Sequence, residues 1–581
     1  MKPDPFVRAA NSCDLVGYGP FALSASGIDV ALVRSGAGWR AFQGRCPHQG
    51  ALLGEGEIEG DRLVCRNHRW RFSLDSGRRD GGPECLASCP AVERDGVIFV
   101  DVSGLEPAPA KPAGKRSLDE LPGPKPRPLV GNVHQIDISK AHLVLEGWAK
   151  QYGPTFRFWR GRTPVVVTSD AAMINEILRA RPETFRRSAK TDETLSELGI
   201  KGVFNAEGEV WRSQRKLAVA ALAQRNLKQL YPHIETVAHR LKRRWDRAAA
   251  TGEALDVVDE MKRFTVDVTM LIAFGHDANT VEASNDVIQR YLEVILPRVG
   301  QRLFATVPIW RYVRLPSDRR LDRALAAVRE WLGVLLAETR RRLEAGSGHP
   351  DRPANFLESM VTAVDEHGEP FSDATIMSNL ITMLIAGEDT TAFTLAWAVH
   401  ELCDAPRWRD ALRREADDVF GLPDVAADVD AVNRLAVASA VANEALRLRP
   451  VAPFSGASAN VDTSLGEYFV PKGTTILLLF RPEAVELTNF ADPLAFKPAR
   501  WLDAPSGPHN PSAQIPFGSG PRMCPGRSLA LLEMKTLLSM MYKSFDVERA
   551  GRAEDVTELF GFTMSPAGLR IRLRPRSGAA H

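Results

Sequence analysis

The sequence predicts two domains of different class, an all-β domain at the N-terminus and a larger, mainly α-helical domain with a minor β-sheet. Three observations predict this division. At 581 residues the chain is too long for one hydrophobic core. From Val16 to Val102, short β-like runs alternate with turn clusters such as EGEIEGD. Beyond residue 121, long segments carry the i, i+3, i+4 apolar spacing of helices.

The domain boundaries follow from a change in composition. Residues 1–102 form the predicted β domain, and residues 103–120 form a linker rich in Pro, Ala and Lys that we expect to be an extended spacer. Residues 121–581 form the helical domain. Within it we expect helices over 143–153, 171–181, 211–224 and 325–345, and strands over 164–168 and 475–480.

Composition narrows the class of protein. Lys plus Arg (74) nearly balances Asp plus Glu (72), so no bulk charge calls for a nucleic acid or an anionic membrane as partner. The longest apolar run, around Ile381–Ile385, soon meets Glu388 and Asp389, which argues against a membrane span. The polar start of the chain does not resemble a signal peptide. Seven cysteines are few and odd in number, which favours a reducing, cytoplasmic location.

A first group of metal-binding residue types lies in the β domain. Cys46 and His48 form a C-x-H pair, and Cys65 and His68 form a C-x-x-H pair, with sixteen residues between the two pairs. Two thiolates and two imidazoles are compatible with a structural zinc site. Zinc fingers, however, usually pair Cys with Cys and His with His, whereas each loop here supplies one of each. That arrangement suits a two-iron cluster with unlike ligands on its two irons.

This stretch resembles the Rieske [2Fe–2S] family, including Trp70, Phe72 and Gly77 after the second pair. The resemblance implies that Cys46 and Cys65 bind one iron and that His48 and His68 bind the other. High-potential members carry a disulfide at the positions of Ala51 and Asn67, so the lower-potential ferredoxin type is expected. The mononuclear iron motif of Rieske dioxygenases is absent from the sequence downstream.

A second cysteine motif lies near the end of the chain. Phe517, Arg522, Cys524 and Gly526 belong to the run FGSGPRMCPG, and a strong helical pattern follows. Cys524 is therefore expected just before a helix N-terminus, where the dipole stabilises a thiolate. A lone cysteine is more often a buried apolar residue. The run nevertheless resembles the F-x-x-G-x-R-x-C-x-G loop of the cytochrome P450 family, which implies heme b with Cys524 as its axial ligand.

A run of small, acidic and alcoholic residues stands in the apolar helix around residue 386. Taken alone, Ala386, Gly387, Asp389 and Thr390 are compatible with a glycine-weakened helix. The P450 resemblance implies that Ala386 and Gly387 adjoin the heme. It further implies that Thr390 contacts bound dioxygen and that Asp389 passes protons inward.

Two further motifs extend the resemblance from about Leu121 to Arg574. Glu444 and Arg447, with Arg500, match a buried Glu–Arg–Arg cluster that supports the heme domain structurally. The same E-x-x-R spacing recurs at Glu176, but only the copy at Glu444 stands between the oxygen helix and the cysteine loop.

The resemblance also implies which residues bind the heme propionates. Trp211 and Arg215 stand four apart and match the propionate-binding pair, with Arg522 as a third partner. One departure is visible. Many members have another propionate-binding arginine after the Glu–Arg helix, where this chain reads APFSGASA.

Together these motifs predict a monooxygenase that inserts one oxygen atom of O2 into a hydrophobic small molecule, with electrons relayed by the Rieske cluster. A strand–GxGxxG–helix fingerprint for a flavin or nicotinamide is absent from the sequence. A separate NAD(P)H-dependent flavin reductase is therefore the expected electron donor. The alternatives are a redox or gas sensor without turnover and a peroxide-driven heme enzyme. Substrate contacts are expected in 188–204 and 296–312 and at Phe454.

Overall fold

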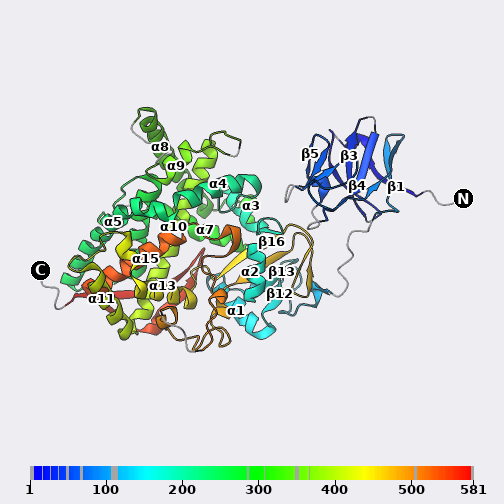
Figure 1. The fold of residues 1–581 in the computed structure, drawn as a ribbon. Helices are drawn as coiled ribbons and strands as arrows, with labels where there is room; N and C mark the ends of the chain where they lie inside the picture. Colours follow the sequence, from blue (N-terminus) through cyan, green and yellow to red (C-terminus); the bar gives the residue numbers. More distant parts are fainter. Residues whose placement is uncertain are drawn as a thin grey trace. The chain divides into compact units, whose positions relative to one another are not determined.

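The computed structural model describes residues 5–15, 17–26, 28–36, 38–47, 52–65, 70–105, 115–283, 287–305, 308–346, 353–365, 367–502 and 507–576. Its contacts divide the chain into two compact units, one of residues 1–120 with 459–473 and the other of residues 121–458 with 474–581. The first unit consists of strands and the second mainly of helices (Figure 1). Both predicted fold classes are confirmed.

Short antiparallel sheets build the N-terminal unit. Two sheets have the orders β1-β10-β9 and β2-β3-β4-β8, and a third has the order β5-β6-β7. The bounds are β1 Phe6–Asn11, β2 Phe21–Ala25, β3 Ile28–Ser35, β4 Gly38–Gln43, β5 Glu57–Glu59, β6 Arg62–Val64, β7 Arg71–Ser73, β8 Ser88–Cys89, β9 Ala91–Arg94 and β10 Val97–Asp101.

A small sheet joins segments that lie far apart in the sequence. Strand β11 (Arg116–Ser117) pairs in parallel with β18 (Tyr468–Val470), which forms a hairpin with β17 (Thr463–Leu465). Arg116 Nη1 also contacts Glu467 Oε1 at 3.0 Å. The last residues of the predicted linker, 116–120, are therefore ordered as β11 and a short 3-10 helix.

Fifteen helices are assigned within the described residues, and those predicted from apolar spacing are present. Their bounds are α1 Ala141–Tyr152, α2 Ala171–Arg179, α3 Ala189–Glu197, α4 Gly208–Ala221, α5 Gln224–Thr251, α6 Val257–Thr269, α7 Val287–Phe304, α8 Pro316–Glu344, α9 Phe356–Thr362, α10 Asp373–Cys403, α11 Pro406–Phe420, α12 Val429–Asn433, α13 Ala436–Leu448, α14 Arg481–Ala484 and α15 Arg527–Ser544.

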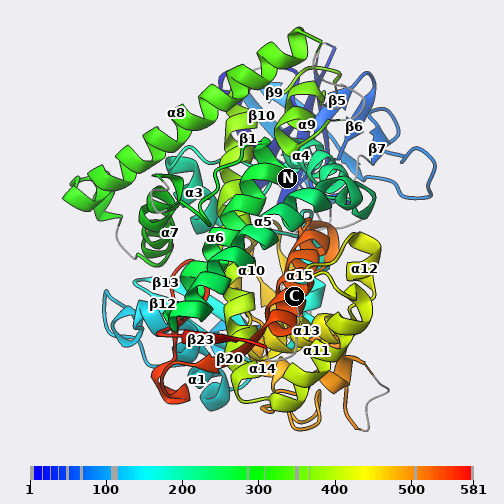
Figure 2. The ribbon, with the colours of Figure 1, turned by 90° about the vertical axis from the view of Figure 1, so that its left-hand side faces the viewer.

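Helix α10 is the central element of the helical unit. The side chain of its N-cap residue, Ser372, accepts a hydrogen bond from the Thr375 amide. Both faces of the helix are buried, against α6, α13 and α15 among others (Figure 2). Within the described part of the chain, none of the helices has the length and apolar character needed to cross a bilayer.

The minor sheet of the helical unit contains both strands predicted there. Its order is β12-β13-β19-β16-β14, with bounds β12 Thr155–Arg160, β13 Thr163–Thr168, β14 Phe185–Arg187, β16 Phe454–Ala459 and β19 Thr475–Leu479. Smaller sheets join β15 Ala254–Asp256, β23 Arg570–Pro575 and β20 Phe545–Arg549, and β21 Thr557–Phe560 with β22 Met564–Ala567.

Candidate active site

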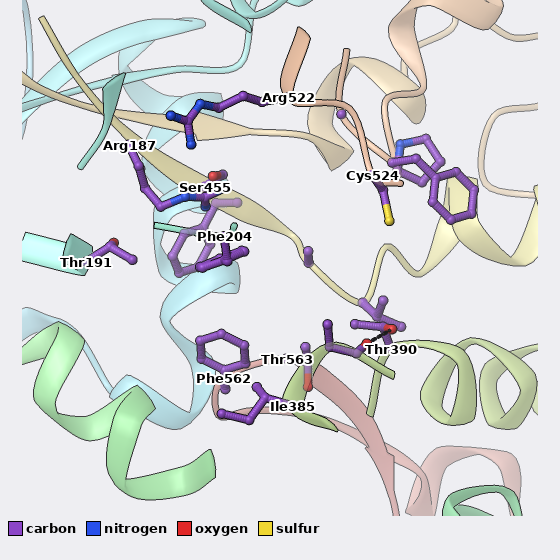
Figure 3. Close-up of a pocket in the computed structure, with 18 of the residues that line it drawn as sticks. Arg187, Thr191, Phe204, Ile385, Thr390, Ser455, Arg522, Cys524, Phe562 and Thr563 are labelled. Carbon is purple, nitrogen blue, oxygen red and sulfur yellow. Dashed lines mark hydrogen bonds between the residues drawn. The ribbon is translucent and has the colours of Figure 1, made fainter. Parts of the chain in front are cut away.

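A cavity of about 530 Å³ lies inside the helical unit. Cys524 points into it from the loop before α15, and Thr390 faces it from α10 (Figure 3). Most of the other lining residues are apolar, including Phe204, Ile385 and Phe562. Trp211, Arg215, Ala386, Gly387, Phe517, Arg522 and Gly526 also line this cavity. The structure thus brings nearly all the predicted heme-domain site residues to one space.

The cysteine loop is shaped by two glycines with left-handed backbone. Gly518 and Gly520 both have φ of +72°. A Cβ at Gly520 would lie 2.5 Å from the Leu178 carbonyl oxygen, so this loop packs directly on the end of α2. The Cys524 amide donates to the Phe517 carbonyl at 2.8 Å, and α15 begins three residues later. The loop therefore holds the sulfur against the cavity at a helix N-terminus.

The environment of the Cys524 thiol contains opposing influences. Removal from water inside the cavity raises its pKa. The backbone N–H groups of Gly526 and Arg527 and the charge of Arg215 act in the opposite direction, because each stabilises a thiolate. A cationic metal in the cavity would add to this stabilisation.

Basic side chains surround the cysteine loop. Arg215 Nη2 donates to the Met523 carbonyl at 2.5 Å, and the Arg522 guanidinium lies 4.3 Å from the centre of the Trp211 ring. Arg522 also forms an ion pair with Glu207. Burial outweighs their attraction, so the pKa of Arg522 is lowered and that of Glu207 is raised.

Two further arginines, which the sequence motifs did not indicate, join this group. Arg181 and Arg187 line the cavity, and burial together with mutual repulsion lowers the pKa of Arg187. The Nε atoms of Arg181, Arg187, Arg215 and Arg522, and Nη1 of Arg522, have no hydrogen-bond partner in the described part of the chain. Four cations gather beside the carboxylate of Glu207, which favours binding of an anion here.

Helix α10 continues without a break through the run Ala386–Thr391. The Thr390 hydroxyl donates to the Ala386 carbonyl at 2.8 Å, one turn back. A Cβ at Gly387 would lie 2.4 Å from the Thr269 hydroxyl oxygen, so only glycine allows α6 to approach this closely. Small residues here keep α10 close to α6 while Thr390 faces the cavity.

Asp389 does not line the cavity but lies in a buried polar network beside it. Lys262 of α6 forms ion pairs with Asp389 at 2.8 Å and with Glu388 at 3.4 Å. The Thr563 hydroxyl donates to Asp389 at 3.3 Å and also lines the cavity. Burial raises the pKa of Glu388, an effect that the charge of Lys262 opposes. Thr563, which sequence reasoning missed, is the link between Asp389 and the cavity.

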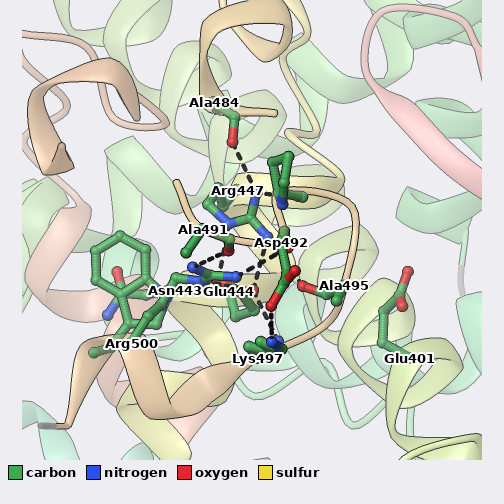
Figure 4. Close-up of polar contacts among 12 residues, drawn as sticks. Glu401, Asn443, Glu444, Arg447, Ala484, Ala491, Asp492, Ala495, Lys497 and Arg500 are labelled. Atoms are coloured by element: carbon green, nitrogen blue, oxygen red, sulfur yellow. Dashed lines mark hydrogen bonds and ion pairs between the residues drawn. The ribbon is translucent and has the colours of Figure 1, made fainter. Parts of the chain in front are cut away.

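A second buried network lies outside the cavity lining (Figure 4). Glu444 accepts hydrogen bonds from Arg447 at 2.7 and 2.9 Å and from Arg500 at 3.0 Å. Arg447 donates in turn to the carbonyls of Ala484 and Pro493. The network ties α13 to the chain segments around 484–500, which is a structural arrangement.

In the N-terminal unit, Cys46 and Cys65 are both buried in one apolar core. Backbone pairs close the loop that follows each cysteine, Arg45 with Leu52 and the Cys65 amide with the Trp70 carbonyl at 2.8 Å. The two cysteines thus lie in the same core, each close to one of these backbone pairs. His48 and His68 lie outside the described residues.

The family model for cytochrome P450 matches residues 121–573. The chain belongs to the cytochrome P450 family. The model for the Rieske [2Fe–2S] domain matches residues 6–91, so this P450 carries a Rieske domain at its N-terminus. These two matches imply a thiolate-bound heme and a [2Fe–2S] cluster.

Curated P450 relatives share somewhat more than a quarter of their residues with this chain. A cytokinin hydroxylase of Arabidopsis thaliana is 29% identical, over 78% of this chain and 91% of its own. A human mitochondrial 25-hydroxyvitamin D-1 alpha hydroxylase is 28% identical, over 75% of this chain and 88% of its own. A self-sufficient P450 monooxygenase of Penicillium camemberti is 27% identical over 80% of this chain, which spans only 44% of that relative's length.

The donor set of the cavity fits heme. Cys524 offers a sulfur ligand, and the unpartnered N–H groups of Arg187, Arg215 and Arg522 suit the two carboxylates of the cofactor. Arg187 supplies a cation that the APFSGASA segment lacks. In the N-terminal unit, two cysteines buried in one core suit one iron of a [2Fe–2S] cluster.

Proposed function

We propose that the protein is a heme-thiolate monooxygenase that inserts one oxygen atom of O2 into a hydrophobic small molecule. The observation that carries this proposal is the placement of Cys524 and Thr390 on opposite sides of one largely apolar cavity. Heme, when bound through a thiolate, supplies the chemistry of oxygen activation. A sensor would not require the acid and alcohol that flank this cavity.

The residues around α10 have distinct parts in this proposal. Thr390 presents a hydroxyl to the reacting oxygen, and Asp389 holds the proton supply. Asp389 lies behind the cavity wall. The Thr563 hydroxyl therefore carries protons between Asp389 and the cavity. Lys262 orients Asp389 through their ion pair. Trp211, Arg187, Arg215 and Arg522 bind and orient the cofactor through its carboxylates.

The Rieske cluster, bound by Cys46, His48, Cys65 and His68, relays single electrons to the heme. Tethering typically gives an effective concentration in the mM range, which favours this transfer. A separate NAD(P)H-dependent flavin reductase supplies the electrons. The name of the Penicillium relative describes it as self-sufficient, but this chain spans less than half of that protein. We place the protein in the cytoplasm on the basis of its sparse cysteines.

A reduction experiment on the full chain tests this proposal. NADH and a ferredoxin reductase are added under carbon monoxide, and the ferrous–CO band of thiolate heme is followed in time. We expect Cys65→Ser to slow this band at least tenfold. Cys85→Ser is the matched control, because Cys85 is exposed and outside the proposed cluster site.

Each rival has its own outcome. Equal rates in the two variants would remove the cluster from the electron path and favour a sensor. Product formed with peroxide but never with NADH and O2 would favour a peroxide-driven enzyme.

A further inference from the structure

A second basic group lines the cavity, apart from the arginines around Cys524. Arg160 ends β12, and Lys190 stands in the first turn of α3; both line the cavity. Lys190 is repelled by Arg160 and Arg311, whereas Arg187 is repelled by Arg181 and Arg522. The lining of the cavity thus includes Arg160 and Lys190 as basic side chains in addition to the arginines near Cys524.

The acidic residues near Lys190 are already engaged. Glu197 forms an ion pair with Arg311 and accepts a hydrogen bond from Trp310 Nε1 at 2.9 Å. Glu193 lies 3.6 Å from the same arginine. Lys190 has the Trp310 ring at 5.4 Å, and within the described part of the chain neither Lys190 nor Arg160 forms an ion pair.

Both side chains are partly buried, and this makes their charges costly. Burial lowers the pKa of Lys190, and repulsion by Arg160 adds to this, while Glu193 and Glu197 oppose it. Burial likewise lowers the pKa of Arg160. An anion between the two side chains would relieve both the desolvation and the repulsion.

The heme does not account for this second group. Its two carboxylates suit the arginines around the cysteine loop, which leaves Arg160 and Lys190 for a different anion. Leu195, Phe204 and Phe562 are among the apolar residues that line the same cavity. Figure 3 shows Thr191, the neighbour of Lys190 on α3, across the cavity from Cys524, with Phe204 and Phe562 between them.

We propose that the substrate is a hydrophobic molecule with a carboxylate at one end, and that Arg160 and Lys190 bind this carboxylate. A guanidinium can bind a carboxylate through two parallel hydrogen bonds, and an ammonium adds a third donor. The apolar body then extends along the phenylalanine-lined wall toward Thr390. This inference rests on the proposed monooxygenase function and names its substrate class.

A binding experiment on the heme-loaded full chain tests this inference. The probes are dodecanoate and dodecanol, which share an apolar body and differ in the head group. Equilibrium dialysis measures their dissociation constants without turnover, and the change in the heme spectrum reports approach to the iron. We expect dodecanoate to bind roughly tenfold tighter than dodecanol, because the free energy of one hydrogen bond to a charged group corresponds to about a tenfold change in the dissociation constant.

The variants are Arg160→Gln, Lys190→Gln and the double variant. Each single change should raise the dissociation constant of dodecanoate roughly tenfold and that of dodecanol less than twofold. Arg160→Lys should restore part of the loss. Lys150→Gln is the control for charge removal, because Lys150 is exposed on α1 and does not line the cavity.

Equal affinities for the two probes, or equal losses of both in the double variant, would overturn the inference and identify Arg160 and Lys190 as solvated cations. The result is separable from the proposed function. A carboxylate preference without oxygen-dependent product would refute the monooxygenase alone, whereas turnover without this preference would refute only the substrate class.

Discussion

Replacing Glu444 by Gln tests how far the buried network of Figure 4 stabilises the heme domain. The Glu444 side chain is fully buried, and five donors bond to it, from Arg447 (twice), Arg500, the Lys497 amide and Trp501 Nε1. Glutamine keeps the shape but offers one acceptor oxygen, and its N–H groups face other donors. The two guanidinium groups would also lose their shared buried counter-charge.

The expected cost is large. Breaking a buried ion pair by removing one partner costs about 3–5 kcal/mol, because a charge is left uncompensated. Glu554→Gln is the matched control, since Glu554 is 66% exposed and pairs with Arg552 at 3.3 Å. An exposed pair of that kind contributes about 0–1 kcal/mol. The difference between the two variants should therefore be at least about 2 kcal/mol.

Urea unfolding measures this difference. Absorbance of the thiolate-bound heme follows the heme domain, and far-UV circular dichroism follows secondary structure. Glu444→Gln should unfold at clearly lower urea concentration than the intact protein, whereas Glu554→Gln should match it. Similar midpoints for the two variants would refute the argument that this network is a major source of stability.

The same network has a defined pH dependence. Burial alone would raise the pKa of Glu444, but the hydrogen bonds and charge of Arg447 lower it below its usual value. A depressed pKa contributes stability above the unfolded value of about 4.3. That stability is lost as pH falls through the folded pKa, so the stability gap between the intact protein and Glu444→Gln should narrow below about pH 4.3.

Other residues give further tests. Thr390→Val should lower the product formed per NADH roughly tenfold or more, because the hydroxyl at the reacting oxygen is lost. Asp389→Asn and Thr563→Val should each lower the turnover rate. If both residues act on one proton path, the double variant should turn over only slightly more slowly than either single variant. Arg187→Gln should raise the heme dissociation constant roughly tenfold, measured by transfer to apomyoglobin. Glu388→Gln should flatten the pH dependence of stability: burial raises the pKa of Glu388, so the intact protein loses stability as pH rises above about 4.3. A parallel pH profile in the two proteins would contradict this.

Local patterns predicted most of the fold correctly. The apolar spacing over residues 211–224 and 325–345 predicts helices because period and burial are set within one segment. The hairpin at 463–470 and its pairing with β11 could not be predicted, since that pairing joins segments some 350 residues apart. Sheet partners at such separation leave little local signal.

The site shows the same division. Cys524 and its glycines form a contiguous motif, and the structure places them at the cavity. Arg187 and Thr563 carry no motif, because their importance comes from what packs against them. Asp389 illustrates a subtler limit. Its position on α10 follows from the sequence, but its orientation toward α6 depends on Lys262, which lies in another helix.

The network of Lys262, Asp389 and Thr563 lies behind the cavity wall, so the proposed proton path is separate from the cavity that would bind the substrate. The Lys262 side chain is 15% exposed, while Asp389 is buried between it and Thr563. In the proposed mechanism, protons would therefore reach Asp389 from the α6 side and not through the cavity itself. Changes in the shape of the cavity, whether by natural divergence or by engineering, need not disturb the supply of protons. If the proposed path is correct, a P450 built in this way would acquire new substrates while it keeps one route for its protons.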